Sequence, residues 1–245
     1  MHNSNLGNLD EYASMNPEFF DNLQLALASE RMDAYRQDEA EPLVTLARYL
    51  WNMALCESLY SPLQIAEIAL RNALHRKLTI RFGTENWFDD ATCRDILSHT
   101  QQHQIDEAKQ TLTIKGKPIS PGRMVAELTF GFWTAFFNKR FAQNSAAIAV
   151  TSGTFHAAPK AERDLRKLNQ RWRRIRELRN RVFHHERIIH WADLEAQHTE
   201  ILRVIGWISP ELQEMAQALD RFTEIRQQGV APWTDKICHH WPHRK

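Results

Sequence analysis

The apolar residues between positions 168 and 182 are spaced as they would be on one face of an α-helix. They follow one another at steps of four, three, three and four residues: Leu168, Trp172, Ile175, Leu178 and Val182. Since an α-helix has about 3.6 residues per turn, this spacing places the five side chains in one stripe. We therefore expect a helix over residues 160–183 that buries the stripe and directs most of its arginines outward.

Similar periodicity recurs along the chain, and residues that break helices are scarce. With 8 Gly and 9 Pro among 245 residues, and 43% hydrophobic residues, the composition favours a helix-rich core over an all-β fold. Turns are expected over 115–118 and 120–122, with a short hairpin there as an alternative, and a loop or lid over 144–159. We expect an all-α fold, with further helices over 18–36, one that begins at Pro42 and carries the apolar face up to Ala54, one after Ser61-Pro62 over 63–82, and others over 92–112, 124–141, 192–207 and 210–228.

The chain is expected to have three parts and to stay in the cytoplasm. The parts are a polar, acidic arm with one helix (1–41), a single helical domain (42–228) and a tail containing His and Trp (229–245). No stretch approaches the roughly 20 apolar residues of a membrane-spanning helix, and the first residues do not resemble a signal peptide. The three cysteines, Cys56, Cys93 and Cys238, form no CxxC pair, so reduced thiols are expected.

Charge is distributed unevenly, although the formal net charge is only +1. Residues 1–60 contain three basic and ten acidic side chains, whereas residues 160–187 contain eleven basic and four acidic ones. This asymmetry favours either an internal acidic-to-basic contact or a surface for a polyanion. For a charge run the ordinary interpretation is a solvated helix face, and Trp172 within it is expected to be core because it lies on the apolar stripe.

The basic segment ends in residues that suit cleavage of RNA without a metal. That reaction needs a base for the ribose 2′-hydroxyl, a cation for the phosphate and an acid for the leaving 5′-oxygen. His184 can serve either proton step, Arg179 can hold the phosphate, and Asn180, on the same helix face as His184, can fix the imidazole or add a donor. Because one chain supplies one clear histidine for two proton steps, a composite site from two subunits is favoured.

The segment Arg179–His184 (RNRVFH) has the form R-N-x-x-x-H, and it resembles the HEPN motif as found in Abi-like (abortive infection) proteins. The continuation HHERI, at 184–188, is also similar to that family, as are three further segments: Ile68–Leu74 (IALRNAL), Pro121–Met124 (PGRM) and Glu127–Trp133 (ELTFGFW). The resemblance covers roughly residues 48–207. It implies a HEPN-like helical bundle, here with additional N- and C-terminal helices. It also implies a homodimer in which motif residues from two subunits face each other, and metal-independent cleavage of RNA in phage defence or a toxin-antitoxin system.

We therefore expect an endoribonuclease with Arg179, Asn180 and His184 as catalytic residues and no cofactor. Its partners would be RNA, a second copy of the chain, and an antitoxin or regulatory protein. The side chains expected to contact RNA are His185, Arg181, Arg187 and Arg176. The alternative is a non-catalytic helical module that binds RNA or protein.

Two other groups of residues are expected to be structural. Arg71, Asn72 and His75 echo the motif with one residue too few between them, so we expect Arg71 to pair with Glu67 or to brace the motif helix. Histidines spaced for a metal occur with Asp95, at His99 and His103, and again at 239–243. Surface histidines explain both, and we expect no metal. A metal-dependent nuclease would be a third possibility.

Overall fold

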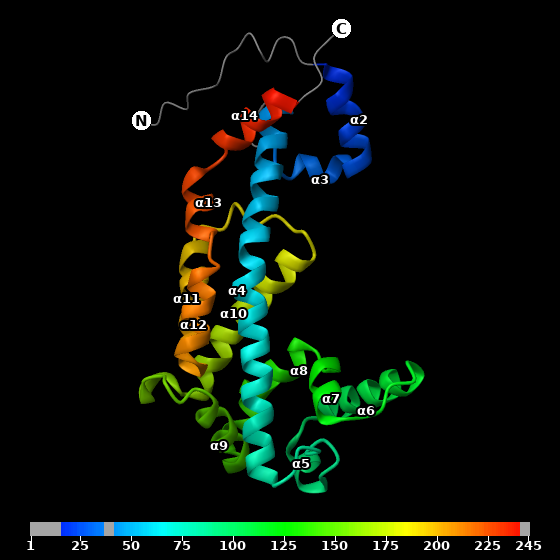
Figure 1. Ribbon diagram of the computed structural model, residues 1–245, viewed down its shortest axis with the longest axis vertical. Coiled ribbons are helices and arrows are strands. Elements are labelled where there is room, and N and C mark those ends of the chain that lie inside the picture. The colour runs from blue at the N-terminus through cyan, green and yellow to red at the C-terminus, as the bar shows by residue number, and fades with distance from the viewer. Residues whose placement is uncertain (1–15, 37–41, 241–245) are drawn as a thin grey trace. The chain divides into compact units, whose positions relative to one another are not determined.

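The structure is a computed structural model that describes residues 16–36 and 42–240, and the predicted all-α fold is confirmed. No strand occurs in these residues, so the alternative hairpin near residue 118 is not formed. In chain order the elements are α2 (Pro17–Leu27), α3 (Ser29–Asp33), α4 (Pro42–Phe82), α5 (Ala91–Ile96), α6 (His99–Ile114), α7 (Pro121–Glu127), α8 (Phe130–Thr134), η1 (Ala135–Phe137), η2 (Lys139–Gln143), α9 (Ser145–Thr154), η3 (Lys160–Glu162), α10 (Leu165–Phe183), α11 (Leu194–Ile208), α12 (Pro210–Ala218), α13 (Phe222–Gln228) and α14 (Ala231–His240) (Figure 1).

The chain divides into two compact units. Unit 1 contains residues 1–60, 181–195 and 220–245, and unit 2 contains residues 61–180 and 196–219. Helices α4 and α10 each contribute residues to both units. The domain boundaries expected at residues 41 and 228 stay a prediction. Among the described helices, none combines the length and the apolar character needed to cross a membrane.

Helix α4 runs from Pro42 to Phe82 without interruption, as the cyan ribbon of Figure 1 shows. Two helices separated at Ser61-Pro62 were expected, and that expectation is wrong because Pro62 is accommodated inside the helix. A proline in a helix interior removes one backbone hydrogen bond, a loss that tertiary packing can offset; Pro62 is buried. The expected end is confirmed, since Gly83 has φ 70 and its N–H donates to the carbonyl of Thr79.

In unit 1 a small apolar core brings together helices that lie far apart in the sequence. The predicted single helix over 18–36 is two helices, α2 and α3, separated at Ala28, whose φ is 68. The segment predicted as a tail contains helix α14, while the polar residues 1–15, the acidic residues 37–41 and the last five residues lie outside the described ones. The buried members of this core come from α2, α3, α4 and α14: Phe20, Met32, Leu43, Leu46, Ala47 and Ile237.

In unit 2 the aromatic segment predicted as one helix over 124–141 is buried in the core, but it is not one helix. Residues 124–141 are divided among α7, α8, η1 and η2, and the side chain of Thr129 accepts from the N–H of Phe132 to begin α8. Short helices turn the aromatic rings to several sides, whereas one straight helix would have exposed some of them. The buried rings are Phe130, Phe132, Trp133, Phe136, Phe137 and Phe141.

Three other expected segments also differ, two of them because polar side chains cap the helices. The helix predicted over 92–112 is two, α5 and α6, because Ser98 and Gln101 form a capping box at the start of α6. The loop or lid predicted over 144–159 contains helix α9, whose first turn is capped by the Asn144 side chain. The helix predicted over 210–228 is likewise two, α12 and α13.

Cys56 and Cys93 are free and buried, and burial raises the pKa of each thiol to about 12.

A half-buried histidine of unit 2 makes its stability depend on pH. Trp87 Nε1 donates to His75 Nδ1 at 2.9 Å, which requires a neutral imidazole, and burial lowers the pKa of His75 below its ordinary 6.5. The unfolded chain then binds more protons than the folded one, so stability is lost as pH falls below about 6.5. We expect urea unfolding to show a smaller loss between about pH 7.5 and about pH 5.5 in His75→Gln than in the wild type.

The matched control for this prediction is His99→Gln, which removes an exposed histidine of unit 2 and should leave the pH dependence of the wild type. A direct reading is the NMR titration of the His75 imidazole. A midpoint at or above 6.5 would contradict the expected shift.

Candidate functional site

The expected site lies on helix α10 and the residues that follow it. The helix begins after Asp164, whose side chain accepts from the N–H groups of Arg166 and Lys167 at 3.0 and 3.1 Å. The predicted apolar stripe is confirmed, because all five of its side chains are at most 3% exposed: Leu168, Trp172, Ile175, Leu178 and Val182. Trp172 packs against aromatic rings of unit 2. It is therefore core, as predicted, and does not present its ring to solvent.

Helix α10 ends in a Schellman motif that fixes the position of the two histidines. The N–H of Glu186 donates to the carbonyl of Arg181 at 2.9 Å, and the N–H of His185 donates to the carbonyl of Val182 at 3.2 Å. His184 is thus the C-cap residue, and His185 takes the left-handed position with φ 58. Both histidines are exposed. Glycine usually occupies the left-handed position, so a histidine there carries a conformational cost.

A buried asparagine of α4 holds the chain that follows the histidines. Asn52 is 2% exposed, and its Oδ1 accepts from the N–H of Ile188 at 2.8 Å and from that of Ile189 at 3.3 Å. Its Nδ2 donates to the carbonyl of Glu186 at 3.3 Å. Because buried backbone groups need hydrogen-bond partners, this one side chain fixes the path of residues 186–189 within unit 1.

Two arginines bind carbonyl groups on either side of this path. Arg31 Nη1 donates to the carbonyl of His185 at 2.9 Å, which satisfies a carbonyl just beyond the end of α10. Arg187, half-buried, donates to the carbonyl of Ala34. Together with Asn52, these contacts fix the backbone around His184 and His185 and leave both imidazoles exposed.

The arginines expected to contact RNA have partners within the molecule. Arg181 forms an ion pair with Glu186 at 2.6 Å and lies 5.3 Å from the ring centroid of Trp191. Arg176 donates to the hydroxyl of Thr134 at 3.0 Å. Ion pairs as exposed as that of Arg181 contribute little to stability, so a phosphate could compete for this guanidinium. The hydrogen bond of Arg176 to Thr134 is partly buried, so this side chain is less available to a phosphate than Arg181.

Arg179 is half-buried and forms an ion pair with Glu67 of α4, from its Nε to Oε2 at 3.2 Å. Its Nη1 also lies 3.5 Å from Oδ1 of the exposed Asn180. Of the two roles expected for Arg71, an ion pair with Glu67 is not among the contacts of the described residues, and bracing of the motif helix stays a prediction. The Nε of Arg71 is buried and has no hydrogen-bond partner in the described part of the chain. The boundary between the units falls after Asn180, so Arg179 and Asn180 belong to unit 2 and the histidines to unit 1.

The sequence interpretation missed Asn52, Arg31 and the true partner of Glu67. Asn52 carried a signal, since it is a polar residue within the apolar periodicity of 43–54, but its partners lie far away in the sequence. In chemical terms the end of α10 offers imidazole nitrogens for proton transfer and nearby guanidinium groups for an anion. In residues 16–36 and 42–240, no group of three or more His, Cys, Asp or Glu side chains is arranged to hold a metal ion.

Comparison with known proteins adds nothing to this geometry. No family model matches the chain, and neither a curated protein nor a solved structure matches it. The case for a function therefore rests on the sequence motif and on the site itself.

The left-handed conformation of His185 leads to a prediction about stability. Replacing it with glycine, in His185→Gly, removes the steric cost of φ 58, and the Schellman hydrogen bonds use only backbone atoms. We expect the free energy of unfolding in urea to rise by about 0.5–1 kcal/mol. A fall in stability would mean that the imidazole makes contacts worth more than this strain.

Loss of the Asn52 side chain should loosen the segment that follows the histidines. In Asn52→Ala the buried N–H of Ile188 and the partly buried carbonyl of Glu186 lose their partner, which should cost about 2–3 kcal/mol. Amide exchange at Ile188 and Ile189 should accelerate more than exchange elsewhere in unit 1. Asn72→Ala is the control, because Asn72 is an exposed asparagine of the same helix and should change stability by less than about 0.5 kcal/mol. Unchanged exchange at Ile188 would contradict the assigned role.

Proposed function

We propose that this chain is a metal-independent endoribonuclease of the HEPN type, acting in the cytoplasm in phage defence or a toxin-antitoxin system. The observation that carries the proposal is the state of His184, the histidine of the R-N-x-x-x-H motif. It is an exposed imidazole at the end of a basic helix, on a backbone fixed by the Schellman motif and by Asn52. A general base needs both accessibility and a fixed position, and a rigid support supplies the second.

In the proposed reaction His184 takes the proton from a ribose 2′-hydroxyl, whose oxygen then attacks the adjacent phosphorus. The bond from phosphorus to the 5′-oxygen breaks, and an acid protonates that oxygen. The products are a 2′,3′-cyclic phosphate and a 5′-hydroxyl. Arg179 stabilises the charge that builds on the phosphate, and Asn180 supports it as a further donor. His185, Arg181, Arg187 and Arg176 are the candidates for holding the flanking RNA.

The proposal includes a homodimer with a composite site. The reaction needs a base and an acid, and the motif of one chain has a single clear histidine for both. A second copy of the chain would supply the second imidazole from its own motif, and two-fold symmetry would give each copy the same surroundings. An antitoxin or regulatory partner would restrain the activity by covering this region.

The test is the cleavage of RNA by the purified full chain in excess chelator. We expect His184→Ala to lower the rate by about 10²–10⁴-fold, because it removes a proton-transfer group, and Arg179→Ala by about 10²–10³-fold. His99→Ala is the matched control: an exposed histidine outside the motif, whose loss should leave the rate unchanged. RNA with a 2′-deoxy residue at the scissile position should be bound and not cut. Equal rates for the wild type and His184→Ala would exclude the assigned site.

The composite site is tested by mixing subunits. Adding an excess of His184→Ala protein to wild-type protein should form mixed dimers with one imidazole and lower the wild-type activity. Activity proportional to the wild-type chain alone would contradict a shared site. Loss of activity in chelator, or in His99→Ala, would instead favour the metal-dependent alternative.

A second candidate function is a non-catalytic module that binds RNA or protein. The observation that favours it is the ion pair of Arg179 with Glu67, together with the hydrogen bond of Arg176 to Thr134. Both contacts engage the arginines of α10 in the architecture of unit 2. Binding of RNA without cleavage of any substrate, by protein whose fold is intact, would support this candidate over the enzyme.

A further inference from the structure

Arg71 of α4 is a half-buried arginine without a partner in the described part of the chain. Its Nε is buried, and none of its nitrogens forms a hydrogen bond or an ion pair with a described residue. Each of the other half-buried arginines described in unit 2 donates to a carboxylate, a carbonyl or a hydroxyl. Because a guanidinium has five donors and a permanent charge, leaving it partly buried without an acceptor costs free energy. A ligand could supply the acceptor that the fold does not.

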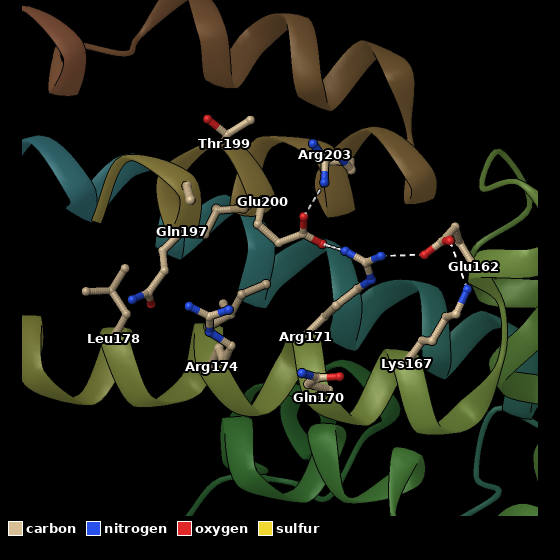
Figure 2. Close-up of a pocket in the computed structure, with 13 residues that line it drawn as sticks. Glu162, Lys167, Gln170, Arg171, Arg174, Leu178, Gln197, Thr199, Glu200 and Arg203 are labelled. Carbon is tan, nitrogen blue, oxygen red and sulfur yellow. Dashed lines mark hydrogen bonds and ion pairs between the residues drawn. The ribbon is translucent and has the colours of Figure 1, made fainter. Parts of the chain in front are cut away.

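Arg171, in the same unit, shows the difference that internal partners make. Figure 2 shows its guanidinium between Glu162 and Glu200, and it forms an ion pair with each of them. The Nε of Arg171 is also buried without a hydrogen bond, but two carboxylates neutralise the charge of the group. Arg71 has the same unpaired Nε and no ion pair with any described carboxylate. Its charge is therefore available to an anion.

Arg71 lies close to the ion pair of the motif arginine. It is four residues after Glu67 on α4, and residues four apart share one face of a helix. Glu67 pairs with Arg179 of α10, and Arg176 lies three residues before Arg179 on that helix. Within unit 2, Figure 1 shows α10 running in the opposite direction to residues 61–82 of α4. Arg71 and Arg176 are therefore each one helical turn from the ion pair, on the same side of it.

This group of four side chains has an excess of positive charge. Three arginines stand against one glutamate, so its formal charge is +2. The carboxylate of Glu67 is engaged by Arg179, and the partner of Arg176 is the neutral hydroxyl of Thr134. Arg71 and Arg176 thus remain as two cations without an ion pair in the described part of the chain. Arginine forms strong, charge-assisted hydrogen bonds with phosphate oxygens, so such a pair suits a phosphate group.

We propose that Arg71, together with Arg176, binds the RNA phosphate next to the scissile phosphate that Arg179 holds. One helical turn rises by about 5.4 Å, so a phosphate bound by Arg71 and Arg176 is displaced along the strand from the one at Arg179. This role depends on the proposed ribonuclease function, because the phosphate belongs to its RNA substrate. Arg71 contacts a phosphate that does not react, so it contributes to binding and takes no part in proton transfer.

The first experiment measures binding of a short single-stranded 2′-O-methyl RNA, which cannot be cut because it has no free 2′-hydroxyl. Arg71→Met removes the charge and keeps a long, unbranched side chain. We expect it to weaken binding about tenfold, and to reduce the slope of log K against log salt by about 0.7, the share of one phosphate on a single strand. Arg76→Met is the matched control, an exposed arginine of α4 that points about 140° away from Arg71, and it should change neither quantity.

The second experiment measures steady-state cleavage of single-stranded RNA. Arg71→Met should raise KM about tenfold and keep kcat within about threefold, because a phosphate that does not react is bound equally in the ground and transition states. Arg71→Lys keeps the charge without the guanidinium fork, so its KM should lie between those of the wild type and Arg71→Met. A lower kcat at unchanged KM would assign Arg71 to the scissile phosphate and overturn the proposal.

Thermal unfolding separates phosphate binding from bracing of the motif helix. Arg71→Met deletes a buried N–H without an acceptor, so the melting temperature should be kept or rise. A lower melting temperature with an unchanged salt slope would show a structural role and contradict the proposal.

The two experiments also separate this role from the ribonuclease activity itself. If the wild type binds RNA with a salt slope that depends on Arg71 but cuts no RNA, cleavage is wrong and the phosphate contact stands. If RNA is cut, and Arg71→Met equals the wild type in Kd, salt slope and KM, the phosphate contact is wrong and cleavage stands. A wild type that neither binds nor cuts RNA would rule out both.

Discussion

The burial of one face of α10 determines where its arginines point. Trp172 is fully buried against aromatic rings of unit 2, and this contact fixes the rotation of the helix about its axis. The remaining faces then bring Arg171 to two carboxylates, Arg176 to a threonine hydroxyl and Arg179 to Glu67. The density of arginine in the sequence thus overstates the charge available to a polyanion. Only the positive charge that these internal partners do not neutralise is available to a ligand.

The end of α10 is held in place by hydrogen bonds to its backbone groups, whereas the arginines along the helix are held through their side chains. The Schellman hydrogen bonds, Asn52 and Arg31 together satisfy groups that the end of a helix leaves without partners. None of these contacts uses the imidazole of His184, so the fold positions that ring without covering it. A histidine at φ 58 beside it, where glycine would be easier, is the kind of local cost that favours a functional interpretation of the segment.

Features that depend on neighbouring residues could be predicted from the sequence, and features that depend on distant ones could not. The apolar stripe of α10 and the end of α4 at Gly83 follow from local periodicity and backbone preference. Pro62 was misjudged because packing overrides its helix-breaking tendency, while Ser98 and Asn144 act through side-chain caps that periodicity alone does not reveal. The exposed histidines were found through the motif. Asn52 could not be assigned, because the carbonyl it binds lies 134 residues away in the sequence.

The ion pair between Glu67 and Arg179 connects the two candidate functions, because each gives it a different meaning. As architecture, it ties α4 to α10 within unit 2, with both side chains about a quarter exposed. As part of a catalytic site, the carboxylate would lower the positive potential that Arg179 offers to a phosphate, but it would also orient the guanidinium. The bond to Glu67 uses Nε, and Nη1 lies 3.5 Å from Oδ1 of Asn180, so a phosphate would have to compete with these partners for the guanidinium N–H groups. The orienting effect prevails only if the favourable interaction of a phosphate with a fixed guanidinium is larger than its repulsion by the nearby carboxylate. Since that gain arises mainly as charge builds in the transition state, the ion pair is compatible with weak binding of RNA and with its cleavage.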